Sequence, residues 1–443
     1  MTPSARVAAS IELLTAMEAN PRKPADAVAH RFFKERRYIG SSDRRTISDL
    51  VWHIMRHWRK LTWWLEKQGF VQQEHIQQIE QRQKITSRLL VGARLLFDGL
   101  SLREVIDLYK DGRFAVGQLT QREIKGLASL EGKALVSSAM PYAVVLEVPN
   151  WLLPFLEESF GSDIEQELAA LSMPAPLDLR VNILRKTREE AYAALVSEGL
   201  YVQKTLLSPW GLRLKERTPI TANTLFREGC VEIQDEGSQL VAAMTGVVPG
   251  MRVLDYCAGA CGKTLAMAMM MKNKGHIVAS DVSASRLEGA VKRLRRAGVH
   301  NVERHLLVEG EKWIKRRLKS FDCVLVDAPC SGIGTWRRNP DARIRLVQAD
   351  LEELVHQQAA ILERAATFVR PGGRLIYATC SVLQRENTDQ IKAFLTRHTV
   401  FRSVPTLSLL VPKILRQKDA VTLTPRRYGT DGFFVAVMER IES

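Results

Sequence analysis

Two cysteines follow two separate apolar segments that have the character of β-strands. Cys330 comes three residues after the segment Cys323–Asp327, and Cys380 directly follows Arg374–Thr379. A single cysteine in such a place is most simply a buried structural thiol. Two thiols at the ends of two strands of one sheet can share a pocket, because open α/β sheets bind ligands at the carboxyl ends of their strands. The arrangement favours a chemical role for the pair.

A pair of thiols suits methyl transfer to a carbon atom of a pyrimidine ring. Carbon 5 of cytosine is a weak nucleophile, but a thiolate that adds to carbon 6 converts the ring into an enamine that can attack an electrophilic methyl group. A base must then remove the carbon-5 proton so that the thiol can leave. Only the thiolate reacts, so one thiol needs a lowered pKa or a base nearby. Asp327 is placed to hold the amino edge or a ring nitrogen of the base.

The residues around Cys330 argue against methylation of an amino group. Amino-group methyltransferases commonly carry Asn/Asp-Pro-Pro-aromatic at the end of this strand, whereas this chain has Asp327-Ala-Pro-Cys330, with a thiol at the aromatic position. The pattern therefore indicates attack through carbon. It does not decide which of Cys330 and Cys380 is the nucleophile.

A loop of small residues follows an earlier strand, Arg252–Asp255, and leads into a helix expected at Leu265–Lys272. Small residues let a ligand approach the backbone N–H groups at a helix start. The loop matches neither the dinucleotide-binding nor the phosphate-loop glycine pattern. Asp281 ends the next strand, where an acid can accept the hydroxyl groups of a ribose. Alternatively, it caps a helix that starts near Ser283. S-adenosylmethionine and nicotinamide cofactors both carry that ribose, so the acid does not choose between them.

Strands alternate with helices from Gln234 to the C-terminus, which predicts an α/β fold with a doubly wound parallel sheet. The expected strands are Arg252–Asp255, Ile277–Asp281, Glu303–Leu307, Cys323–Asp327, Arg374–Thr379 and Phe433–Met438. The catalytic domain is therefore expected to span residues 234–443.

Two further domains are expected before it. Residues 1–140 read as an all-helical domain, in which a capping signal at Ser41-Ser42-Asp43 precedes an apolar stripe at helical spacing. The stripe, expected to be core, consists of Ile47, Leu50, Val51, Ile54, Met55, Trp58 and Leu61. Residues 141–233 are expected to form a connector and a small α+β module, with a strand over Leu177–Leu184 and a helix over Thr187–Leu200.

One segment of the helical domain mixes basic and aromatic residues. It contains Arg44, Arg45, Arg56, His57, Arg59 and Lys60, with Trp52, Trp63 and Trp64 among them. The segment is either a solvated helix face or a patch that binds RNA phosphates, and the sequence leaves both open.

The net charge and the composition limit the kinds of function that the protein can have. The chain has 443 residues, and 64 Lys and Arg against 49 Asp and Glu give a net charge of +15. This surplus favours a nucleic-acid partner, although an anionic membrane surface fits the sign as well. No apolar run reaches the roughly 18–20 residues of a membrane span, so we expect no membrane partner. The six cysteines form neither a disulfide framework nor a paired zinc motif. We therefore expect a cytoplasmic protein that binds no metal. We also expect a monomer.

Four segments carry a resemblance to a known family. They are Val231–Gln239 (VEIQDEGSQ), Asp327–Thr335 (DAPCSGIGT), Thr379–Ser381 (TCS) and Thr430–Phe434 (TDGFF). Together they resemble the Sun/Nol/Nop family of RNA cytosine-5 methyltransferases, most closely its bacterial ribosomal-RNA branch of the RsmB type. The likeness extends over about residues 177–436. Ser41–Leu50 is similar to the NusB-like helical domain that precedes the catalytic part in that branch.

The resemblance implies a fold, a cofactor and a set of roles. The fold would be a class I, Rossmann-like methyltransferase domain after an all-α NusB-like RNA-binding domain and an RNA-recognition-like module. The cofactor would be S-adenosylmethionine and the substrate small-subunit ribosomal RNA, with transfer RNA as an alternative. Cys380 would form the covalent bond and Cys330 would assist product release, with Asp327 beside them. The implied cofactor contacts are Cys257, Ala258, Gly259, Ala260, Cys261, Gly262, Lys263, Asp281, Glu309 and Asp327.

The cofactor loop departs from the family pattern. The family sequence Ala-Ala-Pro-Gly-Gly-Lys is replaced by Ala-Gly-Ala-Cys-Gly-Lys over Ala258–Lys263. If the replaced glycine needs a positive φ, Cys261 costs about 1 kcal/mol and puts a side chain near the cofactor. The alternative function is then an RNA-binding ribosome-assembly factor with an impaired loop. The chain lacks the glycine fingerprint of a nicotinamide-dependent oxidoreductase, which argues against that function.

Overall fold

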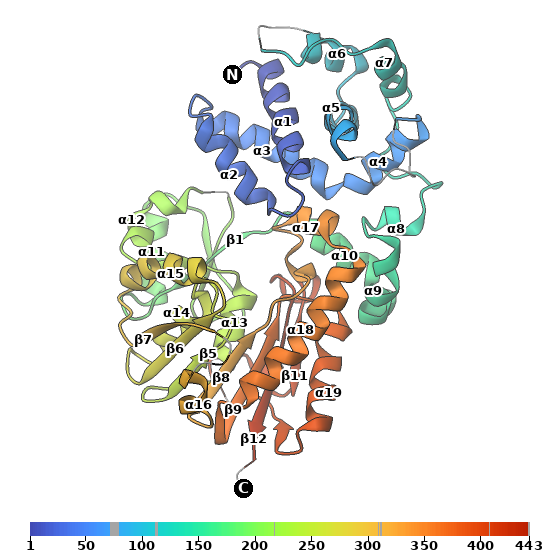
Figure 1. The fold of residues 1–443 in the computed structure, drawn as a ribbon. Coiled ribbons are helices and arrows are strands. Elements are labelled where there is room, and N and C mark those ends of the chain that lie inside the picture. The colour runs from blue at the N-terminus through green and yellow to red at the C-terminus, as the bar shows by residue number, and fades with distance from the viewer. Residues whose placement is uncertain are drawn as a thin grey trace. The chain divides into compact units, whose positions relative to one another are not determined.

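The computed structural model describes the chain except for residues 71–78, 111–113, 217, 309, 311, 407 and 442–443, together with the side chains of residues 79–86. The described chain divides into two compact units, and Figure 1 colours the chain by residue number. The first contains residues 1–154 and 338–346, and the second contains residues 155–337 and 347–443. The helical part therefore runs past the expected boundary at 140 and includes a short segment from the catalytic half.

The first unit is helical and has one hydrophobic core. Its helices are α1 (Pro3–Glu18), α2 (Ala25–Glu35), α3 (Ser41–Arg56), α4 (Trp58–Lys67), α5 (Ile79–Phe97), α6 (Leu102–Lys110), α7 (Gln121–Ala128), α8 (Tyr142–Val145) and α17 (Pro340–Arg345). The predicted stripe is confirmed as core: Leu50 and Trp58 are half-buried, and its five other residues are buried. Gly40 and not a serine is the N-cap of α3, and Asp43 pairs with the N-terminal amine instead.

Neither interpretation of the basic segment, a solvated helix face or a patch that binds RNA phosphates, holds for all of its residues. Arg56 and Lys60 are only 5% and 9% exposed, so they are neither a solvated face nor a surface that phosphates can reach. Lys60 Nζ lies 3.7 Å from the buried carboxylate of Glu147. That carboxylate also accepts the backbone N–H groups of Arg59 and Lys60, at 2.9 and 3.1 Å, at the start of α4. These two cations belong to the interior of the helical unit.

The second unit begins with two helices and a small antiparallel sheet. Its elements are α9 (Leu153–Phe160), α10 (Ile164–Ser172), β1 (Leu177–Val181), α11 (Arg188–Ser197), β2 (Val202–Lys204), β3 (Gly211–Leu214), α12 (Thr224–Arg227) and β4 (Val231–Ile233). The strand order is β2-β3-β1-β4. The expected strand and helix of the module are both present, and Thr187 caps α11 in a capping box with Glu190.

A larger sheet follows in the same unit. Its strands are β5 (Arg252–Asp255), β6 (His276–Asp281), β7 (Val302–Leu306), β8 (Phe321–Asp327), β9 (Val369–Thr379), β10 (Phe401–Ser403), β11 (Ala420–Leu423) and β12 (Phe433–Arg440). The order is β10-β12-β9-β8-β5-β6-β7, with β11 also paired to β12. The helices of this part are α13 (Glu236–Met244), α14 (Gly262–Met270), α15 (Ala284–Ala297), α16 (Lys312–Arg317), α18 (Gln348–Ala366), α19 (Thr388–Arg397), α20 (Lys413–Arg416) and α21 (Pro425–Tyr428).

The topology confirms the predicted α/β class and corrects one detail. The strands β5 to β9 pair in parallel, whereas β12 runs antiparallel to β9, so the sheet is mixed and not wholly parallel. The order reverses at β5, which lies between β6 and β8. A switch point of this kind opens a crevice beyond the carboxyl ends of the strands. In the described part of the chain, no helix combines the length and apolar content that a bilayer crossing needs.

Candidate active site

A cavity of about 1270 Å³ opens at the carboxyl ends of β5, β6, β8 and β9. Its lining includes most of the residues expected at the site. These are Cys257, Ala258, Gly259, Ala260, Gly262, Lys263, Asp281, Asp327, Cys330 and Cys380. The strand ends therefore bring the cofactor loop and both predicted thiols to one cavity.

The two thiols are in contact. The sulfur atoms of Cys330 and Cys380 lie 3.3 Å apart, and neither cysteine forms a disulfide. Backbone hydrogen bonds hold their loops together: Ala328 N–H donates to the carbonyl of Ala378, and Gly334 N–H donates to that of Cys380, each at 2.9 Å. Parallel pairing of β8 with β9 places both loops at the same edge.

The surroundings of Cys330 keep its thiol protonated. Its hydrogen bond to Cys380 raises its pKa well above the ordinary value, and burial and the nearby charges of Cys380 and Glu386 act in the same direction. A thiol with a raised pKa is a poor nucleophile and can hold a proton. Either sulfur can be the donor in this hydrogen bond.

A largely buried lysine lies near the Cys380 thiol. Lys263 Nζ donates to Asp327 Oδ2 at 2.5 Å. Burial lowers the pKa of Lys263, but the charges of Asp327 and Cys380 more than offset this, so the pKa is raised overall and the ammonium stays charged. The sequence pointed to Lys263 only as a cofactor contact, because its distance from Cys380 cannot be read from spacing.

The carboxylate of Asp281 organises the cofactor loop as well as the following helix. Its oxygens accept the backbone N–H groups of Gly259 and Ser283, both at 2.8 Å. Asp281 is not the cap of α15, because the N-cap is Ser283, whose hydroxyl accepts the N–H of Arg286; Asp281 lines the cavity. The backbone at Gly259 has a positive φ and faces open space, because a Cβ there would meet nothing within 4 Å. A ligand can approach this backbone closely.

An apolar wall completes the cavity on the side of Asp281. Val282 is 78% exposed although it is apolar. The wall also includes Leu307, Val308, Ile314 and Leu318. An acid that can bind ribose, an apolar wall for a nucleobase and a loop of small residues fit S-adenosylmethionine.

Cys261 is a correction to the predicted cofactor contacts. Its φ is +61°, so the replaced glycine position does require the left-handed conformation. Its side chain is fully buried among Leu265, Ala279 and Leu294 and does not line the cavity. The thiol therefore points into the core and not toward the cofactor. Glu309 lies outside the described residues.

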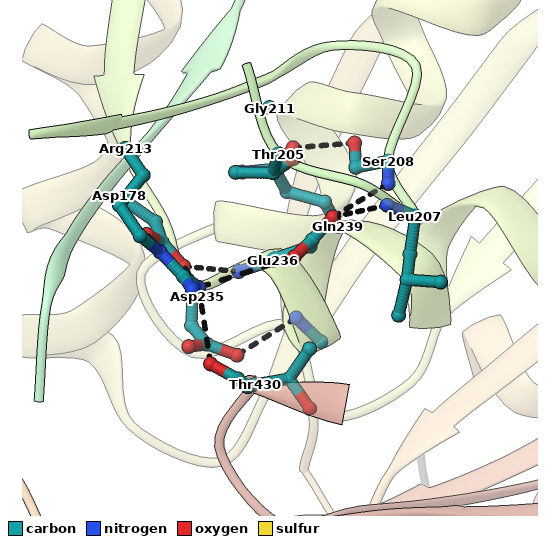
Figure 2. A network of polar contacts seen from close by, with 12 residues as sticks. Asp178, Thr205, Leu207, Ser208, Gly211, Arg213, Asp235, Glu236, Gln239 and Thr430 are labelled. Carbon is teal, nitrogen blue, oxygen red and sulfur yellow. Dashed lines mark hydrogen bonds and ion pairs between the residues drawn. The ribbon is translucent and has the colours of Figure 1, made fainter. Parts of the chain in front are cut away.

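The segment Val231–Gln239 supports the site from a distance. Asp178 on β1 binds Arg213 through two hydrogen bonds of 2.6 and 2.8 Å and accepts the N–H of Glu236 (Figure 2). The side chain of Glu236 accepts the N–H groups of Leu207 and Ser208 at 2.6 and 2.8 Å. The segment thus joins the small sheet to α13. The sequence had shown only that this segment resembles a known family, and the structure shows that it has a structural role.

The small sheet also reaches the cofactor loop. Arg180 on β1 is buried, and its guanidinium donates to the side chain of Gln234 and, at 2.9 Å, to the carbonyl of Gly262. Gly262 begins α14, three residues earlier than expected, so Lys263 lies in the first turn of that helix. One arginine therefore connects the module to the helix that carries Lys263.

Two sequence families match parts of the chain. The family described as 16S rRNA methyltransferase RsmB/F matches residues 244–439. The ferredoxin-like domain of RsmF/B-like methyltransferases matches residues 148–221, which include the small sheet through β3. The second match lies within residues 141–233.

Several relatives and solved structures are similar to the chain. A probable ribosomal RNA small subunit methyltransferase B of Bacillus subtilis is 31% identical over 74% of this chain and 73% of its own length. Ribosomal RNA small subunit methyltransferase B of Pseudomonas syringae pv. tomato is 32% identical over 71% and 70%. The crystal structure of PH0851 matches with a TM-score of 0.79 and 25% identity over 99% of both chains. A methyltransferase homolog from Pyrococcus horikoshii matches with a TM-score of 0.57 and 26% identity, over 69% of this chain and 100% of its own.

Proposed function

The chain belongs to the RsmB/F family of 16S ribosomal-RNA methyltransferases, and from this premise we propose that it methylates carbon 5 of a cytosine in small-subunit ribosomal RNA through a covalent adduct with Cys380. S-adenosylmethionine is the cofactor and supplies an electrophilic methyl group. The observation that carries the proposal is the contact of the Cys330 and Cys380 sulfur atoms at the cavity.

Cys380 acts as the nucleophile. Its thiolate adds to carbon 6 of the cytosine, a carbon–sulfur bond forms, and the electron pair of the ring double bond moves to carbon 5. Carbon 5 would then bond to the methyl group of S-adenosylmethionine, whose methyl–sulfur bond breaks to leave S-adenosylhomocysteine. The Asp327 carboxylate, which accepts a hydrogen bond from the Lys263 ammonium, accepts another from the amino edge of the base. A base buried in a duplex needs flipping, which costs a few kcal/mol, so a single-stranded target is favoured.

Cys330 assists release. Adduct formation removes the charge of Cys380 and its hydrogen bond to Cys330, which are two of the causes that raise the pKa of Cys330. Cys330 can then give its proton to bulk water through the cavity that it lines, and the resulting thiolate removes the proton from carbon 5. The electron pair of that C–H bond restores the ring double bond, and the carbon–sulfur bond to Cys380 breaks.

The two cysteines should give opposite results on substitution. With methylatable RNA and S-adenosylmethionine, Cys330→Ala should accumulate a protein–RNA adduct that survives denaturing electrophoresis, because attack proceeds and release does not. Cys380→Ala should abolish both the adduct and methylation. Cys230→Ala, which removes a buried thiol of the small sheet, is the matched control and should behave as the wild type.

The reverse pattern, with an adduct in Cys380→Ala and none in Cys330→Ala, would exchange the two roles. Absence of S-adenosylmethionine binding at millimolar concentration in calorimetry would instead favour an assembly factor without catalysis. Bisulfite sequencing of total RNA from cells with and without the protein locates the methylated base. A site in transfer RNA would contradict the proposed substrate.

The helical unit is proposed to bind RNA as a NusB-like domain. A second cavity of about 750 Å³ lies within this unit and is lined by Trp58, Arg59, Trp63, Lys67 and other residues. Indole rings next to cationic side chains can stack unpaired bases and neutralise phosphates. This lining and the net charge of +15 support the proposal.

A further inference from the structure

A fully buried carboxylate lies next to the two thiol loops. Glu386 ends the short turn Gln384–Glu386 after β9 and has no exposed surface. Its Oε1 atom accepts the backbone N–H of Ser331 at 2.8 Å and the side-chain amide of Gln358 at 3.0 Å. Its Oε2 atom accepts the hydroxyl of Ser331 at 2.5 Å and the hydroxyl of Ser381. Four donors thus satisfy one buried carboxylate.

These donors are the chain neighbours of the reactive thiols. Ser331 directly follows Cys330, and Ser381 directly follows Cys380. The same amide of Gln358 that binds Glu386 also donates to the carbonyl of Pro329 at 2.9 Å, on the other side of Cys330. The carboxylate and this amide therefore fix the Cys330 loop on both sides.

Such an arrangement restricts the geometry of the loops. A buried carboxylate is costly unless it is hydrogen-bonded, and bonds to a charged acceptor are about twice as strong as neutral ones. Displacement of either loop would break one or more of these bonds. The turn itself is fixed, because the Tyr377 hydroxyl donates to the backbone carbonyl of Glu386 at 2.7 Å.

We propose that Glu386 is a positioning residue for the reaction, whose carboxylate holds the Cys330 loop against the Cys380 loop so that the two sulfur atoms stay in contact at the cavity. The reaction it serves is the one under Proposed function, on which this inference rests. The charge of Glu386 has a second effect that makes it measurable. It is one of the causes that raise the pKa of Cys330, after the hydrogen bond to Cys380 and burial.

The test compares Glu386→Ala with Glu386→Gln in the full chain. An amide can accept from Ser331 N–H with its oxygen and donate to the hydroxyls with its nitrogen, so the glutamine variant keeps the connection and removes the charge. Glu363→Gln is the matched control: this acid on α18 pairs with Arg397 and His398 and contacts neither thiol loop.

Two readouts separate positioning from general stability. The first is kcat against KM: Glu386→Ala should lower kcat by about 100-fold, the typical cost of a small misplacement, and change KM for S-adenosylmethionine by less than about threefold. The second is alkylation of Cys330 by iodoacetamide as a function of pH, followed by mass spectrometry. In Glu386→Gln this profile should shift to lower pH, with a kcat between those of wild type and Glu386→Ala.

Wild-type kcat and an unshifted alkylation profile in both variants would overturn the proposal. If Glu386→Ala does not fold, the double variant Ser331→Ala, Ser381→Ala removes only the two hydroxyl donors. Its kcat should fall by about tenfold, the equivalent of about 1.4 kcal/mol, and an unchanged kcat would equally overturn the proposal. The alkylation profiles need neither RNA nor cofactor. A wild-type chain without methylation would therefore refute the proposed function and leave the role of Glu386 to be decided by those profiles.

Discussion

Asp255 at the end of β5 is a buried acid whose protonation is coupled to folding. It is 1% exposed, and the hydroxyl of Thr264 donates to it at 2.6 Å. Burial raises its pKa to about 7, and the charge of Asp327 contributes in the same direction. The folded chain thus binds this proton more tightly than the unfolded chain, where the ordinary pKa is about 3.9.

The sign of the resulting pH dependence follows from linkage. The contribution of Asp255 to the free energy of unfolding is largest below about pH 4, falls as the pH rises from about 4 to 7, and is level above that. Between pH 5 and 8, the free energy of unfolding of the wild type should fall by roughly 3 kcal/mol more than that of Asp255→Asn. Denaturant unfolding at the two pH values measures this difference. Parallel changes in both proteins would mean that Asp255 has an ordinary pKa.

The residues of the site could be predicted to different degrees. Cys330, Cys380 and Asp281 follow strands, so the topology of an α/β sheet predicts their common location from sequence alone. The left-handed backbone of Cys261 could be expected as well, but not that its side chain points into the core. Glu386 was missed because a polar residue in a short turn gives no periodic signal, and only the folded loops bring its donors together.

At the scale of elements, the start of α4 shows why a basic segment can be misinterpreted. Buried Lys60 pairs with Glu147, which lies 87 residues further along the chain. Local charge patterns predict helix faces, but they carry no information about such distant partners. All six expected strands of the large sheet end within two residues of their predicted last residues, because buried strands of such sheets are continuous apolar runs, although β9 begins five residues earlier than expected. The antiparallel direction of β12 depends on a connection that spacing does not encode.

Charge reversal in α4 should therefore damage folding before it affects RNA binding. Lys60→Glu places a second carboxylate next to Glu147 in the interior and should cost at least about 3 kcal/mol of stability, the usual penalty for breaking a buried pair. Lys67→Glu, at an exposed position of the same helix, is the control and should stay within about 0.5 kcal/mol. Hydrogen exchange of the α4 amides in the full chain measures the stability of both variants. Equal protection in the two variants would show that the Lys60–Glu147 pair contributes little.

At the scale of the whole molecule, the order of helical domain, small module and catalytic sheet could be predicted from the sequence. The sequence did not predict that a short segment from the catalytic half belongs to the helical unit. Residues 338–346 follow the Cys330 loop in sequence, yet they belong to the helical unit. Asp341 in this segment accepts the N–H of Ala25 at 3.0 Å, across 316 residues of chain. Composition changes and periodicity mark domain boundaries along the chain, and neither reports that nine residues of one half complete the other.

The helical unit should therefore be incomplete without that segment. A fragment of residues 1–154 loses the cap that Asp341 gives to α2, and it leaves Glu147 buried without the charge of Arg343, which acts on it in the complete unit. The same fragment with residues 338–346 joined to its C-terminus through a flexible linker should be more stable by at least about 2 kcal/mol, or about 4–8 °C in Tm. Asp341→Ala and Arg343→Ala in the joined fragment should each remove part of that gain. Equal melting temperatures for the two fragments in thermal unfolding would mean that the helical unit folds without the segment, and that residues 338–346 only rest on its surface.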